Sequence, residues 1–187
     1  MYDHAKPEEV EKEVNAQIER ALAAGIDVTH VDSHMGTIMS PLFIQSYIQA
    51  ASSRLLPSML PRLTAKGIEM MGVGEQERMA YMPVMQMLES MGVPMLDGLL
   101  SMPLNEPSES AQMEIAKGLL GDLPEGITHF ILHPSIDTPE LRAIAPDWES
   151  RVANYNVFMS EELKRFLERE EIKLIGYRQL REAMRQG

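Results

Sequence analysis

Apolar residues recur every three or four positions in several stretches of the chain and run almost without interruption in others. One helix is predicted from Pro7 to Gly25, and its apolar face consists of Val10, Val14, Ile18 and Leu22. The same periodicity predicts further helices over residues 41–51, 75–90, 107–120, 160–170 and 178–185. Apolar runs predict strands over residues 26–32, 95–101, 127–132 and 173–177. Residues 55–60 are compatible with a strand or an extended connection, and residues 68–73 with a strand or a rim segment.

The predicted strands alternate with the predicted helices. They are apolar throughout rather than at every second position, which is typical of a parallel sheet covered on both faces. The sequence therefore predicts an α/β fold. A length of 187 residues with 44% hydrophobic content favours one domain spanning residues 1–187. The proline-containing stretch 134–146 is interpreted as a functional loop.

Two imidazoles and one carboxylate fall within five positions at the end of the first predicted strand. Because side chains alternate along an extended backbone, His30, Asp32 and His34 are expected on one face. These are donor types that first-row metals bind, and Gly36 follows in a loop. The pattern is typical of a mononuclear hydrolytic metal site. A chance pair of histidines at this spacing is the alternative interpretation.

A second histidine pair with the same spacing, His129 and His133, lies at the end of the third predicted strand. These two pairs contain four of the chain's five histidines. His129 stands beside Phe130 and is interpreted as a core residue, whereas His133 is either a site residue or a buried side chain with its own partner. In open and closed parallel sheets, active sites collect at the carboxyl ends of the strands. The positions of His34 and His133 at two such ends favour a common site.

Composition excludes several kinds of chemistry and partner. The chain has no cysteine, so disulfides, zinc–thiolate sites and thiol nucleophiles are excluded. A net charge of −11 with only 17 basic residues argues against nucleic acid and favours a neutral substrate. The 16 methionines are expected to fill gaps between helices rather than to bind copper(I). The sequence shows no run of eighteen apolar residues and no secretory signal. We therefore expect a cytoplasmic protein that does not bind a membrane.

Three segments resemble the YdjC/ChbG–HpnK family of carbohydrate deacetylases. The first is His30-Val31-Asp32-Ser33-His34, preceded by Gln17-Ile18-Glu19-Arg20-Ala21 and Gly25. The second is His133-Pro134, which resembles the family's strand-end His-Pro, and the third is Asp147-Trp148-x-x-Arg151 with Tyr155. The resemblance runs through essentially the whole chain. It implies a (β/α) barrel of the glycoside hydrolase/deacetylase type that removes N-acetyl groups from acetylated amino-sugar oligosaccharides with a divalent metal.

The resemblance also implies roles for individual residues. His34 would be a metal ligand, His30 a second contact to the zinc or magnesium ion, and Asp32 a partner that orients an imidazole. His133 would act as an acid or as a donor to the tetrahedral oxyanion. Two further residues remain open: Arg151 would contact substrate or form an ion pair within the scaffold, and Trp148 would stack on a sugar ring or lie in the core.

Some features of the family are missing from this chain. Further histidines often follow the equivalent of His34 in the family, whereas Met35 and Gly36 stand here. The family begins with a strand ending in Asp-Asp, and no such pair occurs in these 187 residues. Closed barrels of this type take roughly 250 residues, so the sequence is expected to correspond to the C-terminal part of an incomplete barrel. The alternatives are an inactive, truncated homologue that binds a partner or forms a homodimer, and a different amide or phosphoester hydrolase.

Overall fold

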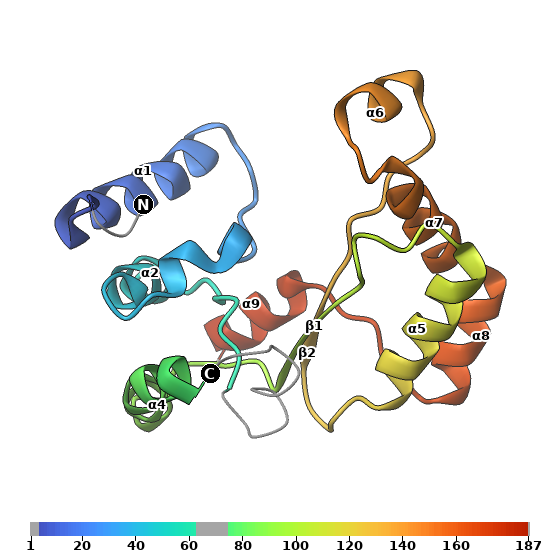
Figure 1. Cartoon of the computed structure of the whole chain (residues 1–187). Helices are drawn as coiled ribbons and strands as arrows, with labels where there is room; N and C mark the ends of the chain where they lie inside the picture. The colour runs from blue at the N-terminus through green and yellow to red at the C-terminus, as the bar shows by residue number, and fades with distance from the viewer. Residues whose placement is uncertain (1–3, 63–74, 187) are drawn as a thin grey trace. The chain divides into compact units, whose positions relative to one another are not determined.

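The computed structural model describes residues 4–62 and 75–186 and divides the chain into two compact units (Figure 1). The first unit comprises Met1–Leu96 together with Ile175–Gly187, and the second comprises Asp97–Leu174. The His30–His34 motif therefore belongs to the first unit, whereas His133 and Arg151 belong to the second. The expectation of one domain over the whole chain stays a prediction.

Helices dominate the first unit. They are α1 (Pro7–Ala23), the 3₁₀ helix η1 (His34–Met39), α2 (Ile44–Ser52), α4 (Glu75–Ser90) and α9 (Tyr177–Gln186). Helix α1 begins with Pro7 because the first position of a helix needs no backbone N–H donor and suits the fixed φ of proline. Its buried Ile18 forms a small core with Ala50 of α2 and with Leu56. The predicted apolar face of α1 is thus confirmed at Ile18, which is buried, whereas Leu22 is exposed.

The larger core of this unit surrounds Tyr47 of α2. It consists of Ile44, Tyr47, Ile48, Leu60, Met85 and Leu88. The Tyr47 hydroxyl donates a hydrogen bond to the carbonyl of Val31 at 2.6 Å and accepts one from the N–H of Met59 at 3.0 Å. Burial raises the pKa of this hydroxyl above its usual range. The neutral phenol of Tyr47 therefore connects the extended segments that contain Val31 and Met59.

The strand predicted over residues 26–32 forms only one parallel bridge, between Val31 and Ser58. Val31 exchanges backbone hydrogen bonds with Pro57 and Met59, and the bridge does not extend into a ladder. The expectation of a full strand is therefore wrong for the described residues. Residues 27–30 instead make side-chain and carbonyl contacts to α9. Residues 68–73, interpreted above as a strand or rim, lie outside the described part of the chain.

The second unit contains a parallel pair of strands and four helices. These elements are β1 (Gly98–Ser101), α5 (Glu109–Gly121), β2 (Thr128–Ile131), α6 (Pro139–Ile144), α7 (Trp148–Phe158) and α8 (Glu161–Arg169). Figure 1 shows β1 and β2 side by side, and Gly98 pairs with Thr128 at the start of the register. A Cβ at Gly98 would stand 2.6 Å from Thr128 Oγ1, so glycine allows the two strands to approach. The unit's core consists of Met102, Met113, Ala116, Leu120, Val157, Leu163 and Phe166.

The α/β character with parallel strands is confirmed, but only two strands are found in the described residues, so a full barrel is not shown. The strand predicted over residues 173–177 is wrong: this segment forms no ladder, and Leu174 is 78% exposed. Helix α7 was not predicted, and the expected loop 134–146 contains the short helix α6. Within residues 4–62 and 75–186, no helix is both long and apolar enough to cross a membrane.

Candidate functional site

His133 is the second residue after β2 and lies at the carboxyl edge of the parallel pair. It lines a narrow pocket that leaves no room for a water molecule, together with residues from the segment after β1 and from α7; the full lining is Met102, Pro103, Leu104, His133, Ser150, Arg151 and Asn154. The lining combines apolar side chains with an imidazole, a hydroxyl, an amide and a guanidinium. This is the edge at which parallel sheets hold their active sites.

A buried polar network fixes the backbone at His133. The N–H of His133 donates to Asn154 Oδ1 at 3.0 Å, and Asn154 Nδ2 donates to Gln112 Oε1 at 2.8 Å. The Gln112 amide in turn donates to the carbonyls of Glu106 at 2.6 Å and of Ser150 at 2.9 Å. Gln112 is 0% and Asn154 3% exposed. Because buried amides are costly unless their hydrogen bonds are satisfied, this network holds β2, α5 and α7 in one arrangement.

The imidazole of His133 carries a buried nitrogen that the scaffold does not satisfy. Among the described residues, its Nδ1 has no hydrogen-bond partner. The carboxylate of Asp147 lies close enough for the charge of His133 to contribute to its pKa. The larger effect comes from Arg151, whose Nε donates to Asp147 Oδ1 at 2.9 Å and lowers the pKa of that carboxyl. A polar atom left without a partner inside a pocket wall is rare and marks a candidate functional group.

Trp148, the first residue of α7, is half-buried and interacts with a cation. The guanidinium of Arg142 lies 4.5 Å from the centre of its ring, in cation–π geometry. Arg142 also donates to both carboxylate oxygens of Asp137 at 2.6 Å, which lowers the pKa of Asp137. The indole is therefore held at the surface of the α6 segment rather than in the core.

His30 of the first unit is held from two sides. Its ring stacks on that of Tyr177, with the centroids 4.0 Å apart and an interplanar angle of 4°. Its Nδ1 lies 3.0 Å from Thr29 Oγ1. When Nδ1 donates its proton to that hydroxyl, the lone pair is on Nε2, which is the form of imidazole that ligates metals.

Asp32 and His34, by contrast, are exposed. His34 is the first residue of η1, and the following Met35 and Gly36 have φ values of 61° and 68°. The left-handed conformation suits Gly36 but strains Met35, and such strain is found mostly where the surrounding fold or a function requires it. Burial raises the pKa of Tyr177 to about 12, and the charge of Asp32 adds to this rise. Asp32 is therefore near the ring that stacks on His30.

The donor types of this motif suit a divalent ion, since imidazole and carboxylate bind zinc. Their arrangement does not complete a centre: among residues 4–62 and 75–186, no three His, Asp or Glu side chains group as a metal site requires. The structure thus brings Asp32 near the His30–Tyr177 pair and leaves His34 on the adjacent turn. His133 is in the other unit, with its own pocket.

Comparison with known proteins decides the family. The family model described as YdjC-like protein matches residues 1–169. This chain belongs to the YdjC-like family. A carbohydrate deacetylase of Thermus thermophilus is 31% identical over 188 residues, which cover 98% of this chain and 64% of that protein. A carbohydrate deacetylase of Thermoanaerobacter pseudethanolicus is 22% identical, with 94% of this chain and 61% of that protein covered.

A solved structure supports the fold of this YdjC-like chain. A crystal structure from Enterococcus faecalis V583, named for a cellobiose-phosphate cleavage protein, superposes with a TM-score of 0.69 at 19% identity. The match covers 96% of this chain and 63% of that one. The YdjC-like chain therefore spans less than two thirds of the length of these relatives.

Sequence reasoning missed the residues that support the two motifs. Gln112, Ser150 and Asn154 lie on the inward faces of α5 and α7, beside Met113, Ala116 and Val157. The spacing of Ser150, Asn154 and Val157 follows a helical face, which was a usable signal. Tyr177 had no such signal, because its contact with His30 joins positions far apart in the sequence.

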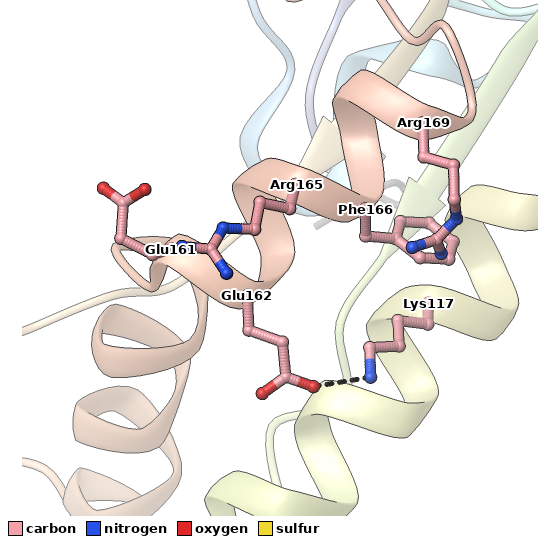
Figure 2. A pocket seen from close by; sticks show the side chains of 6 residues that line it. All are labelled: Lys117, Glu161, Glu162, Arg165, Phe166 and Arg169. Carbon is pink, nitrogen blue, oxygen red and sulfur yellow. Dashed lines mark hydrogen bonds and ion pairs between the residues drawn. The ribbon is translucent and has the colours of Figure 1, made fainter.

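A second depression, of about 500 Å³, lies between α5 and α8 (Figure 2). Its lining is Lys117, Glu161, Glu162, Arg165, Phe166 and Arg169. Lys117 Nζ donates to Glu162 at 2.7 Å and to Glu114 at 3.2 Å, which raises its pKa, and the Arg169 guanidinium lies 5.0 Å from the Phe166 ring. Cations and carboxylates are mixed in this depression, and we assign no function to it.

Proposed function

We propose that this YdjC-like chain belongs to a carbohydrate deacetylase that removes N-acetyl groups from acetylated amino-sugar oligosaccharides. The observation that carries the proposal is the position of His133 just past the carboxyl edge of the parallel strands, with a buried Nδ1 that has no hydrogen-bond partner among the described residues. The names of the curated relatives support the same reaction class. Amide hydrolysis requires an acid for the leaving nitrogen and a donor to the oxyanion, and a histidine can supply either.

In this proposal, the residues of the second unit have separate catalytic, supporting and binding roles. His133 donates a proton to the leaving amine or a hydrogen bond to the tetrahedral oxyanion. Asn154 and Gln112 fix the backbone from which the imidazole projects. Arg151 holds the carboxylate of Asp147 through the hydrogen bond from its Nε. Trp148 provides an aromatic surface on which a sugar ring can stack.

A divalent metal, zinc or magnesium, is the second part of the proposal. His34 and His30 would ligate it, and Asp32 would orient an imidazole beside them. When bound, such an ion polarises the acetyl carbonyl and lowers the pKa of a bound water. The described residues do not group three donors, so we derive no catalytic step through the ion. The support here is the donor chemistry of the motif and the Thr29 contact that orients His30.

The test is acetate release from an N-acetylated chitin disaccharide. We expect the wild-type chain supplied with zinc to release acetate, and His133→Ala to lower kcat about 10²-fold or more, because the acid is lost. His4→Ala is the matched control, since His4 is exposed and outside both motifs. Equal rates for His133→Ala and wild type would contradict the role of His133. Absence of acetate release from wild type would contradict the function.

A second candidate is an oligomerising module without catalysis, and one observation favours it. The described residues form a two-stranded sheet, and a sheet this small leaves strand edges that can pair with a second copy. Light scattering at several concentrations decides between the candidates. A stable dimer with no acetate release favours the module, whereas a monomer that releases acetate eliminates it.

A further inference from the structure

The C-terminal helix α9 contacts the histidine motif although it lies beyond the family match. The family model ends at residue 169, and α9 begins at Tyr177. Both α9 and the motif belong to the first unit, so their contacts are internal to one compact body. Two sets of contacts join them, one to the ring of His30 and one to the backbone that leads to it.

The first contact is the stack of Tyr177 on His30. The two rings are nearly parallel, at 4° with 4.0 Å between centroids, so the imidazole cannot turn about χ2 without losing the contact. Thr29 Oγ1 lies 3.0 Å from Nδ1 at the ring's edge. One face of the ring and one nitrogen are thereby fixed. The plane in which Nε2 lies is then determined by Tyr177.

The second contact is a clasp on the preceding residues. Arg181, only 7% exposed in its side chain, pairs with Asp27 through Nη1 and donates from the same nitrogen to the carbonyl of Val28 at 2.8 Å. Arg178 also pairs with Asp27. A guanidinium that binds a carboxylate and a backbone carbonyl together fixes both the side chain and the course of the chain. The segment 27–30 is therefore held by α9 at three points: the Asp27 carboxylate, the Val28 carbonyl and the His30 ring.

We propose that α9 is a clamp that positions His30, with Tyr177 as the positioning residue for the imidazole and Arg181 as the anchor for its backbone. The proposal rests on the proposed function for the role of His30 as a ligand. It adds that the His30–His34 motif depends, in this chain, on a helix that follows the segment matched by the family model. Tyr177 itself touches neither substrate nor metal in this proposal; it acts through His30.

The first test reads the clamp directly by NMR of the histidine ring protons. The signals of His30 are assigned by their loss in His30→Gln. In the wild type we expect them upfield, because the ring lies over Tyr177. Tyr177→Phe should keep this upfield position, Tyr177→Ala should abolish it, and Arg185→Ala, at the exposed end of α9, should change nothing. His30 signals that are the same in Tyr177→Ala and wild type would overturn the clamp.

The second test measures zinc binding by calorimetry with zinc alone. Loss of a residue that orients a metal-binding histidine typically weakens affinity about 10–100-fold. We expect that loss for Tyr177→Ala, with affinity restored in Tyr177→Phe. Wild-type affinity in a folded Tyr177→Ala would overturn the positioning role. If the wild-type chain binds no zinc, the metal part of the proposed function fails, and the ring signals alone decide the clamp.

Discussion

Three uncharged side chains, Gln112, Ser150 and Asn154, support the candidate site of the second unit. Asn154 accepts from the backbone of His133 and donates to Gln112, so it has a partner on each side. Gln112 joins Ser150 and the carbonyl of Glu106 to the same network. Because all three are buried, each hydrogen bond restricts where β2 ends relative to α5 and α7. The position of His133 is thus a consequence of amide chemistry in the core.

The residue-scale prediction compares two asparagines of α7. Asn154→Ala leaves the His133 N–H and the Gln112 carbonyl oxygen without their partner, and we expect the free energy of unfolding to fall by about 2 kcal/mol or more. Asn156→Ala is the control: among the described residues its exposed side chain donates a hydrogen bond to Glu109 alone, and we expect a change within about 0.5 kcal/mol. Urea unfolding measures both. Similar midpoints for the two variants would contradict the supporting role of Asn154.

Helices and strands differed in how well the pattern of residues predicted them. Helices α5 and α8 agree closely with prediction because each contains its own signals: a serine cap, Ser108 or Ser160, and an acidic first turn, followed by a 3.6-residue period. The segment 26–32, predicted as a strand, forms a single bridge, because strand formation depends on a partner elsewhere in the chain. Helix α7 was not predicted because its buried face contains the polar Ser150 and Asn154 beside Ala153 and Val157, so it lacks a purely apolar period.

The element-scale prediction concerns the docking of α9. Hydrogen bonds from Arg181, and then from Arg178, lower the pKa of Asp27 from 3.8 to about 2. Because the folded-state pKa lies below the unfolded value, the ionised carboxylate stabilises the fold above about pH 4, and this contribution is lost as the pH falls towards about 2.

We therefore expect Asp27→Asn to lower the urea midpoint at neutral pH and to flatten its decline between about pH 4 and pH 2. Glu125→Gln, at an exposed position before β2, is the control and should follow the wild-type curve. Parallel declines for Asp27→Asn and wild type would show that the α9 ion pairs do not act on stability in this pH range.

At the scale of the whole molecule, the chain combines a family assignment with two separate groups of candidate functional residues, one in each unit. The sequence motifs predicted candidate site segments at His30–His34 and His133, because each follows an apolar run, and these roles stay predictions. They could not identify the supporting residues Asn154 and Tyr177, whose roles arise from contacts between distant segments. Membership of the YdjC-like family, shown by the match over residues 1–169, agrees with the resemblance expected from those motifs. The barrel stays a prediction, since the described sheet has two strands.

The most direct test of the account measures metal content and acetate release together on wild type and His34→Ala. His34 is exposed at the start of η1, so its replacement should leave the fold intact. We predict that the wild type binds about one zinc or magnesium ion per chain and deacetylates an N-acetylated chitin disaccharide, and that His34→Ala loses both properties. Undiminished acetate release from metal-free wild type, or from His34→Ala, would contradict the proposed metal-dependent deacetylase.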